Sequence, residues 1–390
     1  MNGVEPQVSS RRKHPLRRPF SLATGFGALF MLAGLLFAPS LAPWLMRFDH
    51  WTADWRTAYL SPAAQTPHPL ITLVTITDET LKDLPSSPID RGLLAQLIRA
   101  IDAAQPKAIA VDIFFLKRTE PEKDADLQAA LRSASAPIIL GAIDERGELS
   151  PERWQFQSEF LASTGRPAGY LNLRTEKDGV VRYAARPAPS SQYPKSWPTL
   201  IAETTGVAAS DQGGPIRWTL PGTGSSTPVF ETVLAHDLLA ASANAHAQRL
   251  KDKLVLIGGD FQQPPRDRHR VPLSVRDGNA VPGVIIHAHI LSALLDPATA
   301  VRELDDSSTR ILLVGLGVAG FVIGWTLSRS PLVGLSSWTA ATVILLALDA
   351  IAFTQFNLLL PFTLALVAWF AAVTAGSALR AVARAMGRAG

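Results

Sequence analysis

Residues 70–77 read LITLVTIT, a run of β-branched and apolar residues without a charge. Such a run is typical of a strand that is buried on both faces of a parallel sheet. Residues 91–101 (RGLLAQLIRAI) follow with leucine and isoleucine at helical spacing, and residues 108–115 (AIAVDIFF) form a second buried run. This alternation of strand and helix predicts an α/β fold with a layered, mostly parallel sheet.

The same pattern continues toward residue 295 but becomes less regular in its second half. We expect further helices over residues 124–134, 197–205 and 284–295, and further strands over residues 137–143 and 253–258. Residues 168–173 and 180–185 flank the turn-forming pair Asp178-Gly179. We therefore predict that these two segments pair as a β-hairpin.

Long apolar segments lie on both sides of this α/β region. Each is long enough for a helix to cross the ~30 Å hydrocarbon layer. We predict four transmembrane helices, one before the soluble domain of residues 47–306 and three after it: residues 20–46, 310–328, 331–350 and 356–379. Gly320 and Gly324 give a Gly-x3-Gly step, which permits close helix packing within the chain or between subunits.

Basic residues give the expected orientation. Residues 1–19 and 380–390 are rich in arginine, and Arg329 lies between the second and third predicted spans. Because Lys and Arg beside a span stay cytoplasmic, we expect both termini inside and the soluble domain outside. A cleaved signal peptide ending at Ser40-Leu41-Ala42 is the alternative for the first segment, but its length and Pro43 favour an uncleaved anchor.

Charge and cysteine content exclude several function classes. The net charge is +4, yet residues 50–306 hold 26 Lys/Arg against 30 Asp/Glu, so the basic excess belongs to the membrane flanks. Nucleic-acid binding is therefore not expected. The chain has no cysteine, which excludes disulfides and thiol catalysis. It also lacks the nucleophile-elbow and phosphate-loop motifs, so we expect neither an enzyme nor a cofactor.

Acidic residues follow the predicted strands. Asp78 comes directly after the first strand, Asp112 lies within the second, and Asp267 is in the loop after residues 253–258. Ligands of open α/β sheets bind beyond the carboxyl ends of the strands. We predict that these three, with Arg91, line a crevice for a small ligand or a hard cation. The alternative is that Asp78 caps a helix and that Asp112 pairs with a buried arginine.

Three histidines near Asp267 raise the question of a zinc site. His269 lies in residues 266–270 (RDRHR), and His287 and His289 lie in residues 286–290 (IHAHI). On a helix, two residues apart, the last two point about 200° away from each other and cannot bind one ion. We therefore expect no metal, and we retain His287 as a candidate ligand-binding residue.

Taken in order, these segments resemble the type-2 CHASE domain, the extracellular sensory domain of bacterial cyclases and histidine kinases. The resemblance implies a sensor of outside conditions, with an unknown ligand and no catalytic residues of its own. It covers residues 50–300 and rests on Asp54-Trp55-Arg56, residues 71–81 (ITLVTITDETL), 88–98 (PIDRGLLAQLI), 108–115, 124–131 (DADLQAAL), 178–182 (DGVVR), 253–259 (KLVLIGG), Asp267 before VPL, and 282–288 (PGVIIHA).

Such receptors usually continue into a cytoplasmic output domain, whereas only residues 380–390 follow the last predicted span. Our first hypothesis is an integral membrane sensor that binds a small ligand or a protein partner, alone or as a homo-oligomer. It would pass its state through the helices to a separate output protein. The second is a non-sensing structural subunit that uses the same fold as a scaffold. The third is a metal-dependent hydrolase at the Asp/His loop.

Overall fold

The computed structural model describes residues 25, 27, 43–82, 84, 87–211, 213–222, 227–240, 246–262, 267–327 and 331–386. They fall into two compact units. The sheet unit consists of the described residues of Ala53–Glu303 and Phe353–Leu359. The helical unit holds the described residues up to Thr52 and those of Leu304–Ala352 and Leu360–Gly390. The predicted first span, residues 20–46, lies outside the described residues except for Gly25, Gly27 and its last four positions.

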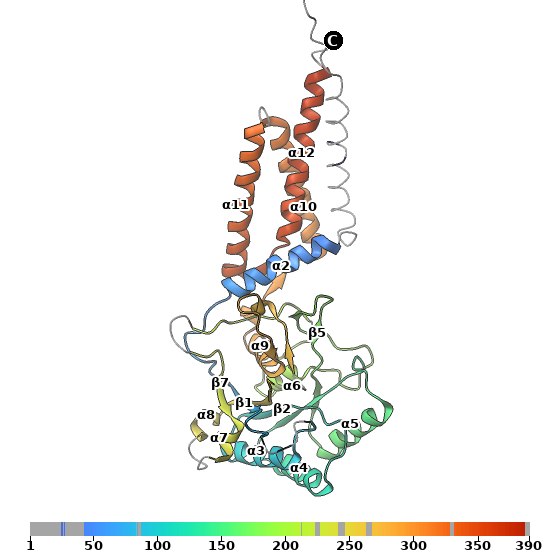
Figure 1. The fold of residues 1–390 in the computed structure, drawn as a ribbon, viewed down its shortest axis with the longest axis vertical. Coiled ribbons are helices and arrows are strands. Elements are labelled where there is room, and N and C mark those ends of the chain that lie inside the picture. Colours follow the sequence, from blue (N-terminus) through green and yellow to red (C-terminus); the bar gives the residue numbers. More distant parts are fainter. Residues whose placement is uncertain are drawn as a thin grey trace, which may run out of the picture. The chain divides into compact units, whose positions relative to one another are not determined.

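The sheet unit is built on a six-stranded sheet (Figure 1). Every neighbouring pair of strands is parallel, which confirms the predicted mostly parallel α/β sheet. In spatial order the strands are β4 (Ala168–Tyr170), β3 (Ile138–Ala142), β2 (Ala108–Asp112), β8 (Leu254–Asp260), β1 (Ile71–Thr77) and β7 (Glu231–Leu234).

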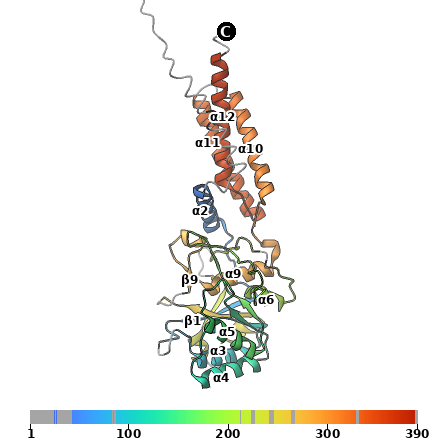
Figure 2. The same cartoon turned by 90° about the vertical axis from the view of Figure 1, so that its right-hand side faces the viewer.

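Helices cover both faces of this sheet (Figures 1 and 2). One face carries α3 (Arg91–Ala103), α4 (Pro121–Ser133) and α5 (Pro151–Thr164), which follow β1, β2 and β3 in turn. The other face carries α6 (Trp197–Glu203) and α9 (Gly283–Leu295). The chain crosses the sheet from β1 to β4 on one face and returns on the other, as right-handed crossovers require.

Strand alternation explains the two cores, because successive side chains point to opposite faces. On β1, Leu73 lies in the core beneath α6 and α9, whereas Val74 lies in the core beneath α3 and α4. On β2, Ala110 and Val111 divide in the same way. Continuing the alternation by one residue places Asp112 on the α9 side.

Shorter elements complete the sheet unit. The helices are α7 (Ala235–Ala240) and α8 (Ala247–Leu250). The strands form three two-stranded ribbons: β5 (Arg174–Thr175) with β6 (Val181–Tyr183), β9 (Arg268–His269) with β10 (Val281–Pro282), and β11 (Arg302–Glu303) with β12 (Leu358–Leu359).

Three features of the sheet unit differ from the sequence-based expectations. The predicted hairpin of residues 168–173 and 180–185 is wrong, because β4 pairs in parallel with β3 and the hairpin is formed by β5 and β6. Helix α5 was not predicted, since its buried apolar side chains are few, and β7 was not predicted because only Val233 of this edge strand is buried.

The helical unit contains the start of α2 (Pro43–Leu60) with α10 (Asp306–Leu327), α11 (Pro331–Phe356) and α12 (Phe362–Met386). Among the described residues, three helices are long and apolar enough to cross a membrane, which confirms three of the four predicted spans. The last one begins at Phe362 rather than at residue 356. Asp49 of α2 accepts a 2.8 Å hydrogen bond from the backbone N–H of Thr363 and so caps α12.

Candidate functional site

The carboxyl ends of β2 and β8 meet the start of α9. Asp112, the last residue of β2, lies opposite Gly258 of β8. A β-carbon at Gly258 would overlap the side chain of Val284, so glycine lets α9 approach the strand closely. The first turn of α9 is therefore held directly against the edge at which Asp112 ends its strand.

Asp267 reaches the same place from the loop before β9. A β-carbon at Gly283, the first residue of α9, would overlap Oδ2 of Asp267. The carbonyl of Asp267 also accepts a 3.1 Å hydrogen bond from the Gly283 N–H. Its Oδ1 lies 2.8 Å from Nε2 of His269. The Asp267 carboxylate thus sits at a helix N-terminus, where a negative charge is favoured.

The two carboxyl groups differ in electrostatics. Burial, and then the charge of Asp267, raise the pKa of Asp112 well above its ordinary value. Oδ2 of Asp112 is buried and has no hydrogen-bond partner. Burial alone would also raise the pKa of Asp267, but the hydrogen bond and charge of His269, with the charge of His287, hold that pKa below its ordinary value. One carboxyl therefore favours a proton, and its neighbour favours the ionised form.

His287 lies behind this pair on α9. It is 3 % exposed, its Nδ1 has no hydrogen-bond partner, and its ring meets Trp197 edge-on at 5.5 Å. Burial lowers the pKa of His287 to about 4, against the opposing effect of Asp267. His289 instead packs against Trp218 and Phe230, which confirms that the two histidines of α9 face different surroundings.

The structure therefore brings together Asp112, Asp267 and His287 of the predicted crevice, and it adds His269. It does not bring in the other two predicted residues. Asp78 accepts a 2.7 Å hydrogen bond from the Gln262 N–H, so it ties the loop after β8 to the end of β1 rather than capping a helix.

Arg91 belongs to the opposite face of the sheet. Its guanidinium lies 4.6 Å from the centre of the Phe115 ring, and Nε is 3.5 Å from Oδ1 of Asp124. Burial lowers the pKa of Arg91, and the acids that oppose this shift are Asp124 and Asp90. The alternative interpretation, in which Asp112 pairs with a buried arginine, is therefore wrong for Arg91.

In the part of the chain that the structure describes, no three His, Asp or Glu side chains are grouped so that they could hold a metal ion. The edge at Asp112 thus offers an unpaired carboxyl, an ionised carboxylate and a neutral imidazole. Such a set can bind a proton or a hydrogen-bond donor. Ligand binding at these residues stays a prediction.

Sequence reasoning did not identify a second polar cluster, which is centred on Arg182 of β6. The guanidinium donates two 2.7 Å hydrogen bonds to Asp54 of α2, and both side chains are 7 % exposed. It also donates to Glu176 at 2.8 Å and to Asp178 at 2.6 Å. The signal was present in the resemblance, since both Asp54 and Arg182 lie in its matching stretches.

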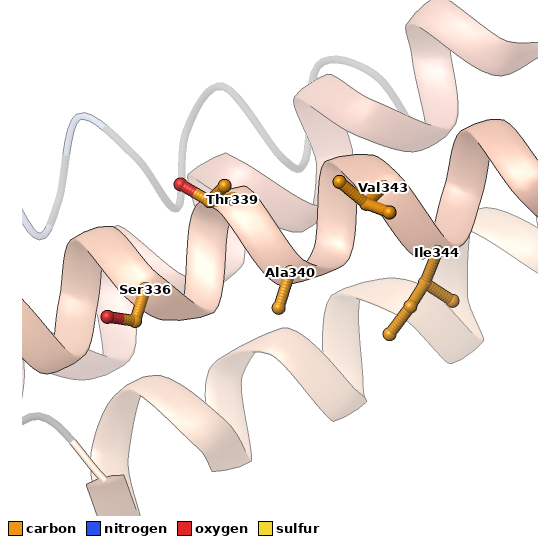
Figure 3. Close-up of a pocket in the computed structure, with 5 residues that line it drawn as sticks. All are labelled: Ser336, Thr339, Ala340, Val343 and Ile344. Carbon is orange, nitrogen blue, oxygen red and sulfur yellow. The ribbon is translucent and has the colours of Figure 1, made fainter.

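The helical unit has a separate hollow on α11. It is lined by Ser336, Thr339, Ala340, Val343 and Ile344 (Figure 3). The lining is mainly apolar and open, and it lies on a helix that is apolar enough to cross a membrane. Lipid would fill such a surface, so we assign it no role in the site at Asp112.

Comparison with known proteins agrees with this architecture. Neither the curated proteins nor the solved structures contain a match to this chain. The family model described as the CHASE2 domain matches residues 28–327, which is more than half of the chain and includes the whole sheet with both residues of the Asp112–Asp267 pair. On that match, the chain belongs to the CHASE2 family of sensory domains.

Proposed function

We propose that this protein is a non-catalytic membrane sensor of bacterial inner membranes, whose sheet unit lies in the periplasm. In this proposal four helices cross the membrane, both termini are cytoplasmic, and Asp112, Asp267 and His287 form the stimulus site. The state of the site passes through the helices to a separate output protein. The CHASE2 match and the three apolar helices support a membrane sensor, and the contacts of β6 support the transmission.

Strand β6 connects the candidate site to helix α2. The segment after His269 pairs with β6, because the Val181 N–H donates a 2.8 Å hydrogen bond to the Arg270 carbonyl. The next residue of β6 is Arg182, which holds Asp54 of α2. A displacement of the segment Asp267–Arg270 therefore reaches α2 through one backbone hydrogen bond and one bidentate ion pair.

Strand β6 also contacts a second segment that leads to the apolar helices. The Tyr183 hydroxyl donates a 2.7 Å hydrogen bond to Oε1 of Glu303 on β11. Strand β11 pairs with β12, which lies between α11 and α12 in the chain. Arg182 and Tyr183 are adjacent on β6, and they contact α2 and the ribbon β11–β12, respectively. In the chain, β11 precedes α10 and β12 precedes α12.

The Arg182–Asp54 pair is buried and bidentate, a geometry that fixes the two side chains relative to each other. Removing one partner of a buried, hydrogen-bonded ion pair costs about 3–5 kcal/mol, because a charge is left without compensation. A modest displacement of β6 is therefore expected to move α2 with it rather than to break the pair. For signalling, the stimulus must favour one of two packing states.

This transmission can be tested with the full chain in lipid nanodiscs by hydrogen exchange of residues 53–60. We expect Asp267→Asn to change exchange in this part of α2, and the change to disappear when Arg182→Lys is added. Lysine cannot make the bidentate contact, although it keeps the charge. Glu203→Gln, which removes a surface ion pair with Lys195, is the matched control. Unchanged exchange in α2 for Asp267→Asn would contradict the proposal.

A non-sensing scaffold subunit is the second candidate. The close packing of Val284 on Gly258 and of Asp267 on Gly283 favours it, since side chains occupy this edge of the sheet. Under this alternative, Asp267→Asn would change only the stability of the sheet unit. The exchange experiment thus separates a scaffold from a sensor.

A further inference from the structure

We propose that the ligand of the Asp112–Asp267 pair is a proton, and that the protein senses the acidity outside the membrane. This inference rests on the proposed sensor function and specifies its stimulus. A proton needs no open cavity, and Oδ2 of Asp112 is buried beside the first turn of α9.

The geometry places two carboxyl groups where only one is stabilised as an anion. Oδ2 of Asp112 is buried without a hydrogen-bond partner, so its ionised form has no compensating donor there. Asp267 has two stabilising neighbours: His269 at 2.8 Å and the N-terminus of α9. A proton that enters the pair therefore binds to Asp112, and Asp267 stays ionised.

The other charged groups at this edge are already paired. Asp260 at the end of β8 forms an ion pair with Arg268 of β9. Arg268 also donates a 2.7 Å hydrogen bond to the Ala280 carbonyl before β10. His287 on α9 is neutral at physiological pH, since burial lowers its pKa to about 4. Asp112 is thus the carboxyl group at this edge whose ionised form has no compensating partner at Oδ2.

Loss of that proton has a mechanical consequence. The Asp112 carboxyl group releases a proton to water and becomes a second anion within electrostatic reach of Asp267. Two carboxylates at close range repel each other. Asp112 is fixed within the parallel sheet, whereas Asp267 precedes the short ribbon β9–β10. Repulsion therefore acts on the segment Asp267–Arg270, whose last residue is bonded to β6.

Infrared difference spectroscopy on the full chain in lipid nanodiscs tests the proton directly. As the pH is raised stepwise from acid values, we expect the protein to lose the band of a protonated carboxyl group above the pH range of an ordinary aspartic acid, with faster hydrogen exchange in residues 174–183. Asp112→Asn should lose both responses. Asp267→Asn should move the midpoint to lower pH, because the repelling charge has been removed. Glu79→Gln, at an exposed carboxyl group near the end of β1, should behave as the unchanged protein.

Two results would overturn the inference. One is an unchanged pH response in Asp112→Asn. The other is a response of residues 174–183 to MgCl2 or CaCl2 at constant pH without loss of the carboxyl band, since this would identify a cation as the ligand. If Asp112→Asn fails to fold, the inference is instead overturned when the pH response of Asp267→Asn has the same midpoint as that of the unchanged protein. If a proton is not the ligand, hydrogen exchange of residues 53–60 still tests separately whether Asp267 is coupled to α2 through Arg182.

Discussion

At the scale of single residues, Asp112 predicts how stability depends on pH. A carboxyl group with a raised pKa in the folded state binds its proton more tightly when folded than when unfolded. Its favourable contribution is complete below the unfolded pKa and is lost as the pH rises through the folded pKa. Asp112→Asn should therefore raise the free energy of unfolding at neutral pH by roughly 1–3 kcal/mol and leave it nearly unchanged near pH 4.

Thermal unfolding of the full chain in detergent at both pH values measures this difference. Glu79→Gln serves as the control, because its side chain is exposed at the same edge of the sheet. An equal loss of Tm at both pH values would show that Asp112 contributes hydrogen bonds in either state. The buried, unpaired carboxyl group would then have another explanation.

Arg91 provides the contrasting residue. It was predicted to bind a ligand, but its guanidinium is buried against Phe115 and close to Asp124. Arg91→Ala should lower the free energy of unfolding by about 2–5 kcal/mol, since it leaves a gap among the buried side chains beside Phe115. Arg91→Met should cost much less, because it fills the space.

Chemical unfolding of the two Arg91 variants, with Arg99→Ala as the control, tests this structural role. Arg99 forms an exposed ion pair with Asp126 on the same pair of helices, so little change is expected there. A variant Arg91→Met that folds with normal stability but loses the pH response would return Arg91 to the stimulus site.

At the scale of elements, glycines determine how α10 packs against α12. A β-carbon at Gly324 would overlap the Val373 carbonyl, and one at Gly376 would overlap the Phe321 carbonyl. Within the described residues, the Gly-x3-Gly step of α10 is thus used inside the chain. Gly324→Leu should separate the two helices at a cost of roughly 1–3 kcal/mol. Gly315→Leu, on the same helix with no atom near its β-position, should be tolerated.

Thermal unfolding followed by circular dichroism compares these two variants. Equal Tm values for Gly324→Leu and Gly315→Leu would indicate that α10 and α12 do not depend on close contact. A selective effect on self-association, with Tm unchanged, would instead assign the glycines to a contact between chains.

The elements that were predicted correctly share a dense apolar pattern. Strand β1 is buried from Ile71 to Ile76, and α3 buries Leu93, Leu94, Leu97, Ile98 and Ile101 on one face. Strand β7 and the hairpin β5–β6 lack such a pattern, because only Val233 of β7 is buried and both residues of β5 are exposed. Only the tertiary structure can show that β4 joins β3, where Gly169 lies against the backbone of Trp197.

At the scale of the whole molecule, three of the four side chains grouped at the candidate site, Asp112, Asp267 and His287, were among those predicted from the sequence. Parallel strands bring their carboxyl ends together, so Asp112 and Asp267 could be grouped from their positions after strands. Strand alternation along β2 places Asp112 on one face of the sheet, and the helix after β1 places Arg91 on the other. The positions of these residues relative to the strand ends do not reveal this difference in face. The connection from Arg182 to Asp54 joins residues far apart in sequence, and charge alone does not identify such a pair.

The orientation of the molecule in the membrane gives the last prediction. Because the chain has no cysteine, single cysteines can be introduced without a background signal. In intact spheroplasts, a membrane-impermeant maleimide should label Ser150→Cys, which is exposed in the sheet unit. It should label Ser10→Cys and Ala389→Cys only after lysis, since in the proposed orientation the basic flanks keep both termini inside. Protection of Ser150→Cys before lysis would reverse the orientation, and loss of the Ser10→Cys signal from the mature chain would show that the first apolar segment is cleaved.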